Sequence, residues 1–262
     1  MRMKRTVSLI VPLLVFASIL ALSLVVKAQD EEPAAKGSPD ATFNATLGFA
    51  MAGTASGGAR VESGQIKTDG KGNFKGSETR SDDGSISTNV PVTGTYSINS
   101  SGTGTITFNP KGFSAENYSI TVVNHTQAGD ALYLETDSGT VVTGSSVGSG
   151  TGCSNSSVSG GYGLVLAGTA DSVGAVAVAG QFTADGKGNL SGSASGSDNG
   201  TIYTDVPISG TYSVKSGCTG TFAISVDSYQ ANFSMTIVNS RKEILLIETD
   251  STTVVAGQAT KQ

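Results

Sequence analysis

Two glutamates lie in nearly identical segments of the chain, "LYLETDSG" at 132–139 and "LLIETDST" at 245–252. Burial of a carboxyl group among apolar strand residues raises its pKa and allows it to bind a polar or cationic group. Alternation places Glu135 on one face with Tyr133 and Asp137, and Glu248 takes the matching position in the second segment. Because ionised carboxylates are rarely buried without partners, we expect both glutamates to point outward at strand ends. A ligand contact inside a barrel is the alternative.

A second motif, Asp-Gly-Lys-Gly-Asn, occurs at 69–73 and again at 185–189. It is no phosphate-binding loop, because the Lys-Ser/Thr pair and the following helix are missing. A calcium loop of the EF-hand type needs several more acids and a distal glutamate. The two glycines suit a hairpin turn, where they adopt positive φ at no steric cost. The motif therefore predicts a turn, and we expect no metal or cofactor here.

Other catalytic arrangements find little support. His125 is the only histidine, and no Gly-x-Ser-x-Gly motif accompanies it. One histidine and two cysteines are too few ligands for a catalytic metal. The sequence therefore favours a non-enzymatic protein without cofactors. A pair of carboxylates inside a barrel leaves acid–base or glycosidic catalysis as an alternative.

The whole chain is duplicated. "VPVTGTYSI" at 90–98 returns as "VPISGTYSV" at 206–214, and "NYSITVVN" at 117–124 returns as "NFSMTIVN" at 232–239. These matches predict two similar domains at 41–145 and 161–262, joined by a Gly/Ser-rich linker at 146–160. Cys153 lies in the linker and Cys218 in the second copy only, so we expect a disulfide that clamps the linker onto the second domain.

Alternation of apolar and polar residues predicts that each copy is all-β. The clearest cases are "TFAISV" at 221–226 and "NFSMTIVN", with turn residues every eight to twelve positions. Short connections favour two tandem up-and-down antiparallel barrels, with two β-sandwiches as the alternative. Glycines within the strands, such as Gly64 and Gly76, suit the bends of a small barrel. The inward faces then include Phe108, Tyr118, Ile120, Phe222, Phe233 and Met235.

The N-terminus has the layout of a secretory signal peptide over residues 1–28. Basic residues precede an apolar run, and Val26-Lys27-Ala28 offers a cleavage site. An uncleaved membrane anchor is the alternative. Cleavage removes four of the 16 basic residues and none of the 21 acidic ones, taking the net charge from −5 to about −9. We expect an exported, periplasmic or extracellular protein with a disordered acidic leader at 29–40, and neither nucleic acid nor membrane as a partner.

The second copy carries a pattern that resembles exported bacterial proteins of unassigned function, common in soil bacteria of the acidobacterial type. It consists of Tyr162, the segment 185–192, Gly-Thr-Tyr-Ser-Val at 210–214, Cys-Thr-Gly-Thr at 218–221 and Ile-Glu-Thr-Asp-Ser at 247–251. The first copy has Gly102 in place of the cysteine and Phe-Lys at 74–75 in place of Leu-Ser. The resemblance implies an exported β-protein and no activity. At the level of the fold, the chain is similar to lipocalin- and avidin-like barrels.

These observations suggest a protein that binds a small apolar or amphipathic ligand inside a barrel. The expected contacts are the two glutamates and four aromatic residues, of which the tyrosines offer hydroxyls at a barrel mouth: Glu135, Glu248, Tyr96, Tyr212, Tyr118 and Phe233. A structural or adhesive protein of the cell envelope is the main alternative.

Overall fold

The computed structural model describes residues 39–124, 130–171, 173–226 and 229–262. The signal peptide expected over 1–28, His125 and most of the leader expected over 29–40 lie outside these residues. The last two residues of that leader, Pro39 and Asp40, begin a short 3-10 helix, η3 (Pro39–Thr42).

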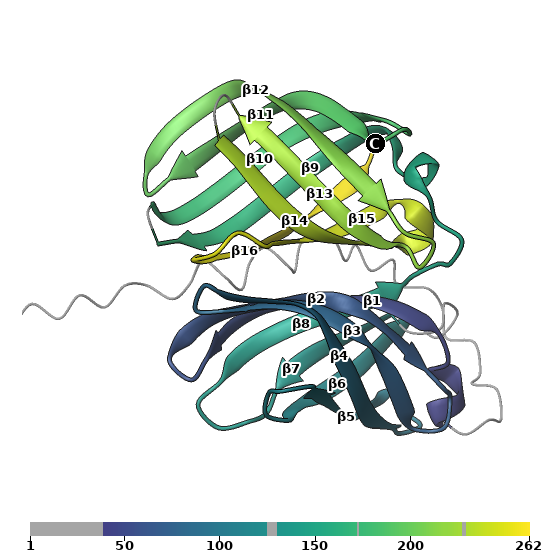
Figure 1. Cartoon of the computed structure of the whole chain (residues 1–262). Coiled ribbons are helices and arrows are strands. Elements are labelled where there is room, and N and C mark those ends of the chain that lie inside the picture. Colours follow the sequence, from purple (N-terminus) through teal and green to yellow (C-terminus); the bar gives the residue numbers. More distant parts are fainter. Residues whose placement is uncertain (1–38, 125–129, 172, 227–228) are drawn as a thin grey trace, which may run out of the picture.

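The first copy folds into a closed antiparallel barrel of eight strands, in which each strand pairs with its neighbours in sequence and the first pairs with the last. Figure 1 shows it below the second barrel. The strands are β1 (Thr46–Ala55), β2 (Gly58–Thr68), β3 (Asn73–Asp82), β4 (Ser85–Ile98), β5 (Thr103–Pro110), β6 (Glu116–Asn124), β7 (Asp130–Glu135) and β8 (Val141–Gly148).

The second copy repeats this barrel, with closure between β9 and β16. Its strands are β9 (Ser159–Ala170), β10 (Gly174–Asp185), β11 (Asn189–Asp198), β12 (Thr201–Val214), β13 (Thr219–Val226), β14 (Tyr229–Val238), β15 (Glu243–Glu248) and β16 (Thr253–Lys261). The prediction of two tandem up-and-down barrels is confirmed. The expected linker at 146–160 starts later than predicted, because Ser146 belongs to β8 and pairs with Phe49 and Ala131.

The repeated Asp-Gly-Lys-Gly-Asn segments are hairpin turns, as predicted. In the first, between β2 and β3, the Asp69 carboxylate accepts hydrogen bonds from the backbone N–H of Lys71 (2.7 Å) and of Asn73 (2.9 Å). Gly70 and Gly72 have φ of 70° and 94°. The turn between β10 and β11 repeats this geometry around Asp185, so the motif specifies backbone conformation.

Inward-facing glycines allow the strands to coil tightly. A Cβ atom at Gly64 would overlap the carbonyl oxygen of Ser77 on the neighbouring strand, and one at Gly76 would overlap that of Gln65. The same close approach occurs at Gly180 in the second barrel. Only glycine permits the backbones to come this close, which is how a sheet of eight strands closes around a small core.

One end of each barrel is closed by the segment that precedes its first strand. In the first barrel, the Asp40 carboxylate accepts a hydrogen bond from the Ile98 N–H (2.7 Å), and the Phe43 ring packs edge-on against Tyr96. In the second, Asn155 of η4 (Asn155–Ser157) accepts from the Val214 N–H (2.8 Å). The predicted disulfide Cys153–Cys218 is present and fixes this segment to the turn between β12 and β13.

The two barrels pack side by side through their outer faces. Strands β1 and β2 face β14, β15 and β16 (Figure 1). Ser81 donates a hydrogen bond to the Thr253 carbonyl (2.6 Å), and an apolar cluster unites both copies: Ala52, Val61, Ile247 and Val254. All six residues of β15 are therefore buried, since one face packs in its own barrel and the other against the first.

Candidate functional site

The twin glutamates point into the barrels. Glu135 is 7% exposed and Glu248 is 5% exposed, on the same faces as the core residues Tyr133 and Leu246. The expectation that they point outward is wrong. It rested on the cost of burying an unpaired carboxylate, and in the first barrel that cost is offset by an arginine far away in the sequence.

Arg60 of β2 is that arginine. Its guanidinium group pairs with Glu135 through Nη2, with Glu116 through Nη1 (3.3 Å) and with Glu62 through Nε (3.0 Å). Nη2 also lies 3.4 Å from the Tyr118 hydroxyl. The guanidinium thus bridges three carboxylates from three strands at the end of the barrel away from η3.

Arg80 of β3 extends the same cluster. It pairs with Glu78 (3.1 Å), Asp82 (2.7 Å), Glu62 (3.2 Å) and Glu116 (2.9 Å). The partly exposed ring of Phe113 covers its guanidinium, with 4.1 Å between Cζ and the ring centre. The side chains of Arg60 and Arg80 together hold five carboxyl groups.

This excess of acid has an electrostatic consequence. Burial, helped by Glu116 and Glu78, raises the pKa of Glu62 well above its ordinary range. Burial also raises the pKa of Glu78 and of Glu135 to about 7, against the opposing effect of the arginines. Two positive charges thus cannot neutralise four buried glutamates and the partly exposed Asp82, and part of the cluster keeps its protons near neutral pH.

The second barrel lacks this cluster at the same positions. Strand register shows which positions of the two barrels are equivalent. Arg60 stands opposite Asp82 in the first barrel, and Val176 stands opposite Asp198 in the second. Likewise, Glu135 stands opposite Tyr118, and Glu248 stands opposite Phe233. The counterparts of Arg60, Glu62, Glu78, Arg80 and Glu116 are, in that order, Val176, Val178, Ala194, Gly196 and Ala231. Every member except the glutamate and the aspartate has been replaced by a small or apolar residue.

The replacement opens the end of the second barrel to solvent. Val176, Val178, Val226 and Ala231 point inward and pack on the core, yet all four are partly exposed. Their counterparts in the first barrel are buried: Arg60, Glu62, Pro110 and Glu116. The same end of the fold is therefore sealed by charged side chains in one copy and lined by accessible apolar side chains in the other.

Glu248 is buried at the same end of the barrel, on β15 opposite Phe233 of β14. Its Oε1 accepts a hydrogen bond from the Tyr229 hydroxyl at 3.4 Å. Among the described residues, no lysine or arginine comes within ion-pairing distance of it. Burial, with a smaller effect from Asp250, raises the pKa of Glu248 to about 7. The neighbouring Asp250 carboxylate accepts hydrogen bonds from the backbone N–H and side-chain amide of Asn232 instead.

The four aromatic residues expected to contact a ligand make contacts within the barrels. Tyr96 donates its hydroxyl hydrogen to the Phe43 carbonyl (2.8 Å), and Tyr212 does the same to Val158 (2.7 Å), so each fastens the closed end of its barrel. Tyr118 packs edge-on against Phe108, and Phe233 packs against Phe222. These rings fill the middle of the barrels, and four partly exposed apolar side chains lie at the end of the second barrel opposite η4: Val176, Val178, Val226 and Ala231.

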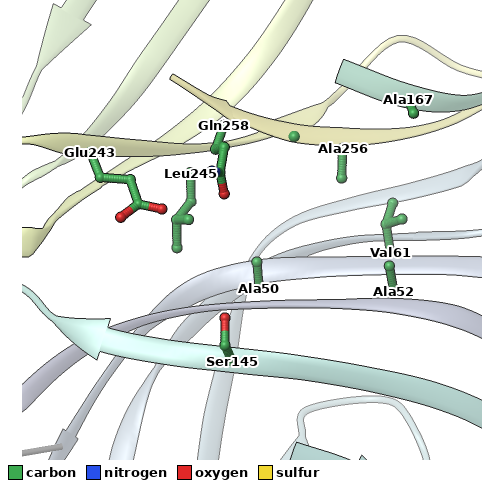
Figure 2. A pocket seen from close by; sticks show the side chains of 10 residues that line it. Ala50, Ala52, Val61, Ser145, Ala167, Glu243, Leu245, Ala256 and Gln258 are labelled. Atoms are coloured by element: carbon green, nitrogen blue, oxygen red, sulfur yellow. The ribbon is translucent and has the colours of Figure 1, made fainter. Parts of the chain in front are cut away.

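A small cavity lies between the barrels. Its volume is about 30 Å³, enough for one or two water molecules, and apolar residues such as Ala52 and Leu245 form much of its wall. Figure 2 shows the Glu243 carboxylate at one end, with Gln258 nearby and Ser145 across from it. Burial raises the pKa of Glu243. The space is too small for an organic ligand.

The sequence analysis missed the five residues that form most of the charged cluster: Arg60, Glu62, Glu78, Arg80 and Glu116. A signal was present. "RVE" at 60–62 and "ETR" at 78–80 place opposite charges two residues apart, on one face of a strand, and the second copy has "VAV" and "ASG" there. A column-by-column comparison of the copies, restricted to inward positions, finds this difference.

No protein-family model matches the chain, and no curated protein is significantly similar to it. Within the described ranges, no helix is long and apolar enough to cross a membrane. In the same part of the chain, no group of three or more His, Cys, Asp or Glu side chains has an arrangement that would hold a metal ion.

Proposed function

We propose that the chain is an exported bacterial binding protein, not an enzyme, and that its second barrel takes up a small amphipathic ligand. The supporting observation is the set of inward, partly exposed apolar side chains at the same end of the barrel as the buried carboxyl group of Glu248. Small-molecule sites combine an apolar lining with a few polar groups that orient the ligand, and this barrel end has both. The corresponding end of the first barrel is sealed by the charged cluster, and we assign this barrel a structural role, in which it packs against the second.

The aromatic core of the second barrel limits how far a ligand can extend into it. Tyr162 stacks on Phe182, and Phe222 packs against Phe182 and Phe233 below the open end. The ligand therefore occupies the end of the barrel and contacts Val176, Val178 and Ala231. An alkyl chain of about eight carbons is a suitable probe.

A single tryptophan tests the proposal, because the natural chain has none. Tyr229→Trp places a fluorophore at the rim next to Glu248, and Phe113→Trp places one at the corresponding end of the first barrel. Octanol and octylamine should change the emission of the Tyr229→Trp variant saturably and leave the Phe113→Trp variant unchanged. Native mass spectrometry of the exported wild-type protein checks for a ligand that co-purifies. An unresponsive Tyr229→Trp variant together with a ligand-free spectrum contradicts the proposal.

A further inference from the structure

The two barrels carry a glutamate at the same position, Glu135 and Glu248, but with different partners. In the first, the guanidinium of Arg60 reaches across the barrel from β2 and pairs with Glu135 on β7. In the second, Val176 stands at the arginine's position, and the matching Glu248 has the Tyr229 hydroxyl as its hydrogen-bond donor. The strands pair in the same order in both barrels, and each glutamate stands opposite an aromatic residue of the preceding strand, so the difference at the glutamate is the missing cation.

We propose that the ligand of the second barrel carries a cationic nitrogen group, an ammonium or a guanidinium, which pairs with Glu248 where Arg60 pairs with Glu135. This inference rests on the proposed function and adds the chemical class of the ligand. The buried Arg60 takes in the first barrel the place that the ligand takes in the second. Its guanidinium pairs with Glu135 as the ligand's cationic group pairs with Glu248, and the ligand's apolar part contacts Val176 and Val178.

Charge complementarity selects this class over neutral or anionic amphiphiles. Glu248 is 95% buried, and Asp250 adds negative charge nearby. An anionic head group would meet like charge, whereas a cationic one recovers the energy that Glu248 loses on burial. The apolar lining excludes water around the pair, which strengthens the attraction between the two charges.

Four eight-carbon probes with different head groups test the inference: octylamine, octylguanidine, octanol and octanoate. At pH 8, above the pKa of about 7, Glu248 is ionised and both nitrogen head groups are protonated. The two cationic probes should bind the Tyr229→Trp protein at least about tenfold more tightly than octanol, and octanoate most weakly. Because Tyr229 itself contacts Glu248, calorimetric titration of the wild-type protein repeats the ranking without that substitution.

Three substitutions test where the cationic group of the ligand binds. Val176→Arg recreates the Arg60–Glu135 pair inside the second barrel and should abolish binding of octylamine. Ala177→Arg puts the same charge on the exposed outer face of the same strand and should leave binding unchanged. Glu248→Gln should keep octanol binding and remove the preference for the amine. Circular dichroism spectra check that each variant is folded.

The possible failures are distinguishable. Two results would overturn this inference while the proposed binding function stands. One is equal affinity for octanol, octylamine and octanoate. The other is that the Val176→Arg protein binds octylamine as tightly as the Ala177→Arg protein does, since Glu248 would then not pair with the ligand's charge. If no probe binds and the native mass spectrum of the wild-type protein shows no co-purified ligand, both fail.

Discussion

Glu135 and Glu248 have similar neighbours along the chain, and burial raises the pKa of both to about 7, but of the two only Glu135 pairs with an arginine among the described residues. The partner of Glu135 is 75 residues away in sequence, so nothing in the local pattern predicts it. Reasoning about a single strand therefore gave the wrong orientation for both side chains. Long-range pairing offsets the cost of burying Glu135, because the closed barrel brings β2 and β7 to the same end, whereas Glu248 is buried with a tyrosine hydroxyl as its hydrogen-bond partner.

The first prediction concerns Arg60. Arg60→Met keeps a long, flexible side chain but leaves Glu135, Glu116 and Glu62 without this partner. Removing one member of a buried ion pair costs about 3–5 kcal/mol, so the free energy of unfolding should fall by about that amount. Urea denaturation measures the change. Lys75→Met, which removes an exposed cation from β3, should change stability by less than about 0.5 kcal/mol. A similar loss in both variants contradicts a special role for Arg60.

The second prediction concerns pH. The folded chain raises the pKa of Glu78 and of Glu135 from the ordinary 4.5 to about 7, chiefly through burial. Below about pH 4.5 both carboxyls are protonated in the folded and unfolded chain alike. Between 4.5 and 7 the unfolded chain has lost protons that the folded chain still binds, so stability falls as pH rises.

The melting temperature should thus be lower at pH 8 than at pH 5, by about 3–10 °C, because 1 kcal/mol shifts it by about 2–4 °C in a protein of this size. Scanning calorimetry at both values tests this. Glu135→Gln removes one of the titrating groups and should reduce the difference. A melting temperature that rises from pH 5 to pH 8 contradicts the assignment of these two groups.

At the scale of elements, much of the fold was predictable. The half-buried strands follow from alternation, and the hairpins at 69–73 and 185–189 follow from an aspartate followed by two glycines. Strand β15 does not follow from alternation, because "EILLIE" is buried on both faces and has no period-two pattern. Its outer face is apolar to match the other barrel, and a period-two pattern within one strand carries no information about a second domain.

The third prediction tests the close approach of strands. Gly64→Ala adds a methyl group that overlaps the Ser77 carbonyl, so β2 and β3 must separate where the barrel is tightly coiled. We expect a loss of about 1–3 kcal/mol in the free energy of unfolding, as for other overpacked interiors. Gly148→Ala, at the end of β8, meets nothing within 4 Å and should cost under about 0.5 kcal/mol. Equal effects would show that strand proximity is not the cause.

At the scale of the whole molecule, duplication followed by divergence explains how the two barrels differ. The copies keep the Asp-Gly-Lys-Gly-Asn turn, strand glycines such as Gly64 and Gly180, and the tyrosine that closes one end, which are features that the backbone requires. They differ at the inward positions of the other end, where the fold tolerates either a charged cluster or an apolar lining. The duplication was evident from the sequence, but the contact between the barrels was not, since small residues such as Ala52 and Ser81 give no signal of an interface.

The last prediction concerns that contact. Ile247 is buried at the interface with Ala52, Val61 and Val254, so the barrels should unfold together in one transition. Ile247→Asp places an unpaired charge in this apolar cluster, at a cost of several kcal/mol, and should divide the calorimetric transition into two. Val141→Asp puts the same charge on the first barrel's exposed outer face, 64% accessible, and should leave one transition. A single transition in the Ile247→Asp protein, at an unchanged temperature, would mean that the interface contributes no stability. The covalent connection alone would then hold the two barrels together.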